Sequence, residues 1–86
     1  SNNRNMINVT VKCFSQVKYA FGEDQFILEL SVGTTTLELE EMVREKANGQ
    51  LDDISLRIAV NQKYTPIDIK LNNGDEVAFI PPVQGG

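Results

Sequence analysis

The sequence has no histidine and only one cysteine, Cys13, among its 86 residues. Without histidine, the Ser/His and Cys/His pairs of nucleophilic catalysis are excluded, and a zinc site is disfavoured because zinc relies on imidazole and thiolate ligands. A lone cysteine cannot form an intrachain disulfide, which favours a reducing compartment such as the cytoplasm. We therefore expect a cytoplasmic protein with no metal site and no side-chain catalytic site of its own.

Positive charge and long hydrophobic runs are also scarce. Eight basic residues stand against 12 acidic ones, for a net charge of −4. Nucleic-acid binding needs clustered Lys and Arg, so we expect no nucleic-acid partner. No apolar run approaches the length of a transmembrane helix and the N-terminus does not read as a secretion signal, so we expect no membrane association. Residues 1–5 are expected to be a disordered tail, either native or left over from expression.

Hydrophobic residues make up 41% of the chain, which is enough for the core of one small domain. Residues 6–14 and 25–32 alternate between apolar and polar positions, as half-buried strands do. A turn-rich connection, residues 15–24, joins them and predicts an antiparallel hairpin. The inward positions are Ile7, Val9, Val11 and Cys13 in the first strand, and Phe26, Leu28, Leu30 and Val32 in the second.

The apolar spacing changes to a helical period after residue 34. Leu39, Met42, Val43 and Ala47 lie at i, i+3, i+4 and i+8, which predicts one buried helix face. Thr35 and Glu38 fit a capping box at its start. Gly49 is the expected C-terminal cap.

The second half of the chain predicts two more strands and a short edge strand. Residues 55–61 place Leu56, Ile58 and Val60 inward. Residues 63–67 could form an edge strand, since Pro66 is tolerated only at an edge or a strand end. Residues 76–80 are apolar on both faces, which is typical of a central strand. The core is expected to contain Val9, Val11, Leu28, Leu39, Val43, Ile58, Val77 and Phe79.

The resulting ββαββ order predicts an α+β roll, in which one main helix covers one face of a mixed sheet of four to five strands. We expect the folded domain to span residues 6–80. Residues 81–86 then form a flexible C-terminal tail that ends in Gly-Gly.

The tail, "PPVQGG", has an unusual combination of residues. Pro81 and Pro82 cannot donate to a sheet ladder, so they end the last strand and favour an extended arm. Gly85 and Gly86 have no side chains and can enter a channel too narrow for any Cβ. A frayed terminus is the plain alternative. A glycine pair at the end of a stiffened arm that follows a central strand favours a functional tail.

Three segments resemble one family, the small sulfur-carrying subunit of molybdopterin synthase. They are "GDEVAFIPPVQGG" (74–86), "AVNQKYT" (59–65) and "VKCFSQVKYAFG" (11–22), whereas the helix and residues 45–55 match only loosely. The resemblance implies the ubiquitin-like β-grasp fold, which agrees with the ββαββ order.

The resemblance also implies a mechanism in which the protein is a non-catalytic, sulfur-donating cosubstrate. A ubiquitin-activating-type adenylyltransferase would use ATP to adenylate Gly86, and a sulfur donor would then replace AMP to leave a thiocarboxylate. The tail, with Gly85 beside the reactive residue, would enter the large subunit of the synthase and pass sulfur to a cyclic pyranopterin precursor. A heterotetramer with the large subunit is expected, and no tightly bound cofactor.

Two neighbouring residues of the first strand have different expected roles. Cys13 is an alternative sulfur carrier, but its parity places it in the core, where a thiol is unreactive. Phe14 has the opposite parity and could share the outer sheet face with Ile80. We expect a partner-binding surface made of Phe14, Ile80, Pro81, Pro82, Val83 and Gln84.

Three rival functions remain open at this point. The thiamine-pathway sulfur carrier shares the fold and the Gly-Gly end, although the paired prolines resemble it less. A ubiquitin-like protein modifier would join Gly86 to lysines of its targets. A non-covalent interaction module would use no chemistry at Gly86.

Overall fold

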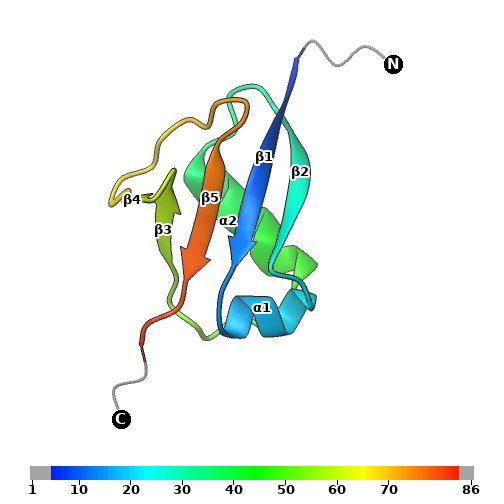
Figure 1. Cartoon of the computed structure of the whole chain (residues 1–86), viewed down its shortest axis with the longest axis vertical. Helices are drawn as coiled ribbons and strands as arrows, with labels where there is room; N and C mark the ends of the chain where they lie inside the picture. Colours follow the sequence, from blue (N-terminus) through cyan, green and yellow to red (C-terminus); the bar gives the residue numbers. More distant parts are fainter. Residues whose placement is uncertain (1–4, 84–86) are drawn as a thin grey trace.

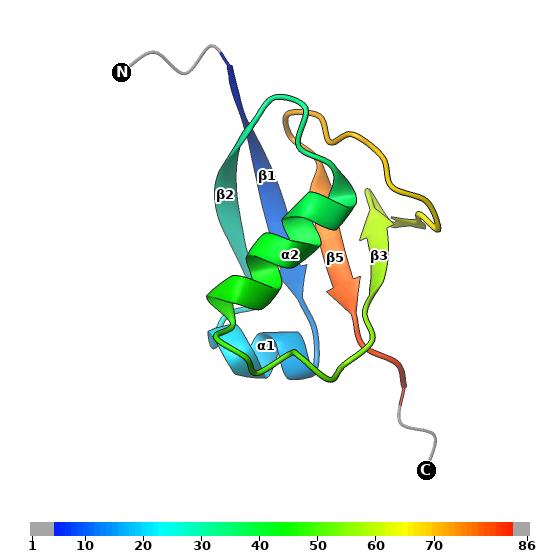
Figure 2. The same cartoon turned by 180° about the vertical axis from the view of Figure 1, so that it is seen from behind.

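The computed structural model describes residues 5–83. The elements follow the order β1 (Met6–Cys13), α1 (Gln16–Phe21), β2 (Gln25–Ser31), α2 (Thr36–Lys46), β3 (Arg57–Val60), β4 (Lys63–Tyr64) and β5 (Glu76–Ile80). The five strands form one sheet in the order β2-β1-β5-β3-β4, and α2 crosses one of its faces (Figures 1 and 2). The predicted α+β roll with a mixed sheet and one main helix is confirmed.

The strand pairing places β5 in the middle of the sheet. β1 pairs antiparallel with β2, with Val9 opposite Leu28, which confirms the predicted hairpin. β1 also pairs parallel with β5, with Val11 opposite Val77, and β3 covers the other side of β5. The central position expected from the two apolar faces of this strand is therefore correct, and β4 is the short edge strand.

The connection between β1 and β2 differs from the sequence prediction, because it contains the short helix α1. This helix of six residues begins after Ser15 and ends at Gly22, whose φ of 70° is left-handed. Val17 is its buried residue, and it packs into the core. A helix with one buried residue has no apolar period to detect, so the segment reads as a turn in the sequence.

Helix α2 begins as predicted and ends earlier than predicted. The Thr35 hydroxyl accepts a hydrogen bond from the Glu38 amide at 3.3 Å, and the Glu38 carboxylate accepts one from the Thr35 amide at 2.9 Å. This confirms the capping box. The expected cap at Gly49 is wrong, because the helix ends at Lys46 with Ala47 as its C-cap, and Asn48 is the first left-handed residue (φ 59°).

The core lies between the sheet and α2. Seven of the eight expected core residues are buried, and Leu28 is partly buried against them. Three inward assignments need correction: Val32 is 61% exposed because β2 ends at Ser31, Met42 is 37% exposed on the rim of α2, and Leu56 precedes β3 and is half-buried. At the ends and rims of strands and helices, the apolar period of the sequence no longer shows which side chains face the core.

Neither a membrane span nor a metal cluster is found in the described part of the chain. None of its helices is long and apolar enough to cross a membrane. Residues 5–83 hold no group of three or more potential metal-ligating side chains.

Candidate functional site

The tail leaves the fold from the end of the central strand. Ile80 forms the last ladder pair of β5, opposite Arg57, and the chain then runs into the two prolines. Pro81 is buried, whereas Pro82 is exposed and Val83 is 93% exposed. Figure 1 shows this segment projecting beyond the end of β3, away from the sheet. The remaining predicted site residues, Gln84, Gly85 and Gly86, lie outside the described residues.

Phe14 lies beside the point where the tail leaves. The parallel pairing of Cys13 with Phe79 brings the next residues of both strands, Phe14 and Ile80, to the same end of the sheet. The Phe14 side chain is 45% exposed. A predominantly apolar hollow of about 500 Å³ is lined by Phe14, Ser15, Ile80, Pro81, Pro82 and Val83, and we call it the tail hollow. The structure therefore brings together five of the six residues expected on a partner surface.

Ser15 has a backbone conformation that its residue type rarely adopts. Its φ of 52° and ψ of −123° lie in a region that is normally occupied by glycine. The turn is closed by the Val17 amide, which donates to the Phe14 carbonyl at 2.9 Å. This tight turn fixes the direction of the chain after Phe14. Sequence reasoning missed it, because a serine carries no signal for a positive φ.

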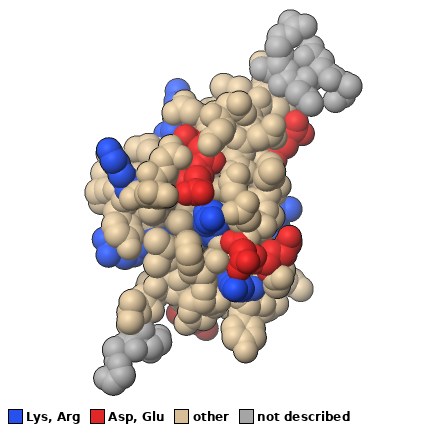
Figure 3. Space-filling model, viewed as in Figure 1, with Lys and Arg blue, Asp and Glu red and all other residues tan. Residues whose placement is uncertain are grey.

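Charged side chains lie among apolar ones on the open face of the sheet. Lys12 donates to the Gln25 amide oxygen at 2.9 Å and lies 3.9 Å from the Glu76 carboxylate. The Arg57 guanidinium lies 3.9 Å from the centroid of the Tyr64 ring. Figure 3 shows charges of both signs across this face. Lys12 and Glu76 lie on the inner strands β1 and β5, so the open face carries charge at its centre as well as toward the β3–β4 edge.

Cys13 lies directly before Phe14, and its thiol is buried in the core. Its side chain is 3% exposed and belongs to the core cluster. Burial, together with the nearby carboxylates of Glu23 and Asp24, raises the pKa of the thiol. A thiol that is buried and protonated is a poor nucleophile, so the folded protein presents no reactive sulfur at this position.

The start of β5 is held by a hydrogen-bonded turn around Asp75. The buried carboxylate accepts a hydrogen bond from the Asn61 side chain at 2.9 Å and one from the Asn72 amide at 2.7 Å. Asn61 in turn accepts from the Glu76 amide at 2.9 Å. Asp75 is therefore used by the fold, and β5 is anchored at the end opposite to the tail.

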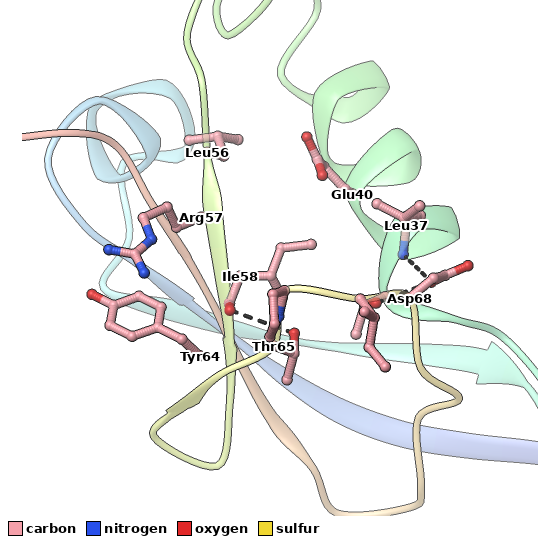
Figure 4. Close-up of a pocket in the computed structure, with 11 residues that line it drawn as sticks. Leu37, Glu40, Leu56, Arg57, Ile58, Tyr64, Thr65 and Asp68 are labelled. Atoms are coloured by element: carbon pink, nitrogen blue, oxygen red, sulfur yellow. Dashed lines mark hydrogen bonds between the residues drawn. The ribbon is translucent and has the colours of Figure 1, made fainter.

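A second cleft, of about 380 Å³, lies between α2 and the β3–β4 edge (Figure 4). Its two acidic side chains, Glu40 and Asp68, are partnered within the fold. The Asp68 carboxylate accepts from the Leu37 amide at 2.9 Å, which lowers the pKa of Asp68, and Glu40 forms an ion pair with Arg44 at 2.9 Å. Sequence reasoning did not find Asp68, because it caps a helix that begins 32 residues earlier. The cleft shares no residue with the tail hollow.

Comparisons with known proteins match this chain to one family and to sulfur carrier subunits. The model of the ThiS family matches residues 11–86. The molybdopterin synthase sulfur carrier subunit of Haemophilus influenzae is 35% identical over 83 residues, which cover 94% of this chain and 100% of that protein. The protein of the same name from Mycobacterium tuberculosis is 37% identical with the same coverage.

Solved structures agree on the fold. A Pyrococcus furiosus protein described as a molybdopterin converting factor subunit 1 is 28% identical, with a TM-score of 0.79 over 90% of this chain and 99% of that chain. A chain of the complex of subunits 1 and 2 of the molybdopterin-converting factor from Helicobacter pylori is similar too, at 26% identity and a TM-score of 0.67 over 93% of this chain and 100% of that chain. The small archaeal modifier protein 1 of Methanosarcina acetivorans, 20% identical with a TM-score of 0.74 over 94% of this chain, shares the fold. The fold is thus the ubiquitin-like β-grasp.

Proposed function

From the premise that this chain belongs to the ThiS family, we propose that it is the sulfur carrier subunit of a molybdopterin synthase. The observation that carries the proposal is the arrangement at the end of β5, where the central strand runs without a loop into Pro81 and Pro82 beside the tail hollow. The relatives named as molybdopterin synthase sulfur carrier subunits support it over their whole length.

The proposed reactive atom is the carboxyl carbon of Gly86. A carboxylate is a poor acyl electrophile, so it first attacks the α-phosphorus of ATP, pyrophosphate leaves, and an acyl-adenylate forms. A persulfide sulfur of a donor protein then attacks the acyl carbon and AMP leaves. Two electrons from a thiol cleave the remaining sulfur–sulfur bond, which leaves a thiocarboxylate on Gly86 and a disulfide on the donor side.

The chain itself supplies position and reach in this scheme. From Pro82 to Gly86 an extended arm spans roughly 15 Å at about 3.1 Å per residue. Proline restricts the unbound arm, which lowers the entropy lost when the tail enters a channel. The enzymes that receive the tail supply the acid and base groups in this scheme, since the residues of the tail, "PPVQGG", have no ionisable side chain.

The proposed partner is the large subunit of the synthase, in a heterotetramer. The Helicobacter pylori structure that contains a chain similar to this one is a complex of subunits 1 and 2 of the molybdopterin-converting factor. The tail hollow offers Phe14 as an exposed aromatic anchor of the kind that dominates binding energy in protein interfaces. A second partner, a ubiquitin-activating-type adenylyltransferase, is needed to form the adenylate.

The experiment incubates the chain with ATP, the activating enzyme and a persulfide donor, followed by intact mass measurement. The unmodified chain should gain the mass difference between sulfur and oxygen, located in the C-terminal peptide. Deletion of Gly86 shortens the arm by about 3 Å, and one added alanine moves the reactive carbon away, so both variants should gain nothing. Sulfur arriving on Cys13, or an equal gain in the extended variant, contradicts the proposal.

A further inference from the structure

The outer edge of β2 is an open strand edge. β2 is the first strand of the sheet order, and among residues 5–83 it pairs only with β1. Figures 1 and 2 show it at the margin of the sheet, with the C-terminal end of α2 crossing its lower end, and no described strand lies on its outer side. An uncovered strand edge carries unpaired backbone donors and acceptors that can pair with another strand.

The ladder to β1 identifies which backbone groups are free. The Asp24 carbonyl accepts from the Cys13 amide at 2.8 Å, and the Val32 amide donates to the Asn5 carbonyl at 2.8 Å. The backbone amides and carbonyls of the even-numbered residues of β2 therefore point toward β1. Because backbone groups alternate in an antiparallel pair, the amides and carbonyls of Gln25, Ile27 and Glu29 point outward.

The edge carries few of the devices that block pairing, and Glu29 is the one charged residue of β2. Residues 25–31 contain no proline, lysine or arginine, and the strand pairs with β1 without a bulge. Ile27, one residue from the middle of the strand, has 68% of its surface exposed. On the other face of the strand, Phe26 and Leu28 are half-buried, so apolar surface reaches the edge on both sides.

We propose that two copies of this chain pair through β2 in an antiparallel register centred on Ile27. A two-fold axis at that residue places Ile27 opposite its own copy, and Phe26 opposite Leu28 of the second copy. It also makes the outward backbone groups at positions 25, 27 and 29 hydrogen-bonded pairs, which is the geometry that an antiparallel ladder requires.

Polar pairing favours the register centred on Ile27 over the register centred on Leu28. The Gln25 oxygen already accepts from Lys12 at 2.9 Å, so the amide nitrogen of Gln25 is oriented to donate elsewhere. The Ile27-centred register sets Gln25 opposite Glu29 of the second copy, so that Lys12, Gln25 and a carboxylate form one polar chain. A register shifted by one residue, centred on Leu28, would instead set Ile27 opposite Glu29.

The dimer is a property separate from the proposed sulfur transfer, and it leaves both tails accessible. Five strand spacings separate the two β5 strands, or about 24 Å. The two-fold axis turns the two strands in opposite directions, so the tails leave from opposite ends of a continuous ten-stranded sheet. A single strand pair is smaller than a standard interface, so we expect a weak, concentration-dependent dimer.

Sedimentation velocity over roughly 10 µM to 1 mM should show the mean mass rising toward that of the dimer. Ile27→Lys should abolish the rise, because the two-fold axis sets two ammonium groups face to face. Ile67→Lys is the matched control and should dimerise normally, since Ile67 is 69% exposed and lines the cleft at the β3–β4 edge, on the other side of the sheet from β2. A mean mass that stays monomeric throughout overturns the proposal.

Two further measurements test the register. A mixture of the Ile27→Lys and Ile27→Glu variants should dimerise although neither does alone, because position 27 faces itself. In the unmodified chain, amide exchange of Gln25, Ile27 and Glu29 should slow at least several-fold at high concentration, and that of Phe26 and Leu28 should not change. Stronger dimerisation of Ile27→Lys alone would indicate pairing with Glu29, and would overturn the proposed register.

Discussion

Phe14→Ala should weaken binding of the large subunit by about 30-fold. An aromatic side chain buries about 200 Å² when fully covered, and 45% of the Phe14 surface remains exposed in the free chain. About 90 Å² is thus available to a partner, worth roughly 2 kcal/mol at about 25 cal/mol per Å². Each 1.4 kcal/mol changes Kd by about tenfold, which gives the expected loss.

Titration calorimetry with separately purified large subunit measures this loss. Val32→Ala is the control, because Val32 is 61% exposed and follows the end of β2 that pairs with the start of β1, away from the tail hollow. The melting temperature of each variant checks that the fold is retained. Equal affinities for the unmodified chain and Phe14→Ala would remove Phe14 from the interface and refute the reasoning from the tail hollow.

Three further predictions concern the fold around the site. Ser15→Gly should raise the free energy of unfolding by about 1 kcal/mol, because glycine adopts the φ of 52° without strain; a loss of stability in urea denaturation contradicts this. The hydrogen bond from the Leu37 amide lowers the pKa of Asp68, so the stability that this carboxylate contributes is present above its unfolded pKa of about 3.9 and is lost as the pH falls through the folded value. The difference in unfolding free energy between the unmodified chain and Asp68→Asn should therefore shrink below about pH 4, and a pH-independent difference argues against the cap. The Cys13 thiol should react slowly with a thiol reagent at pH 8 in the native protein and rapidly in denaturant, because burial raises its pKa; fast native labelling would show that the thiol is accessible.

The fold could be predicted from the sequence where the pattern is long and regular. Alternation over β1 placed Val9 and Val11 in the core, and two apolar faces placed β5 in the centre of the sheet. The capping box of Thr35 and Glu38 could be predicted because both residue types have the side-chain groups that cap a helix.

The errors occur where structure depends on contacts distant in sequence or on backbone conformation. The C-terminal end of α2 was misplaced because Arg44 donates to the carbonyls of Leu51 and Ile54, which turns the chain back earlier than Gly49 suggests. The turn before α1 depends on a positive φ at Ser15, and a serine in the sequence does not indicate a positive φ. Of the candidate site, the juxtaposition of Phe14 and Ile80 followed from strand parity once β1 and β5 were neighbours.

The most direct test of the central claim follows the sulfur atom itself. The chain is prepared with a ³⁴S-labelled thiocarboxylate on Gly86 and mixed with the large subunit and the cyclic pyranopterin precursor. The account predicts that ³⁴S appears in the pterin product as a dithiolene while the chain returns to the mass of its carboxylate form. A thiocarboxylate that stays on the chain in the presence of the large subunit and precursor, with no labelled pterin formed, would contradict it.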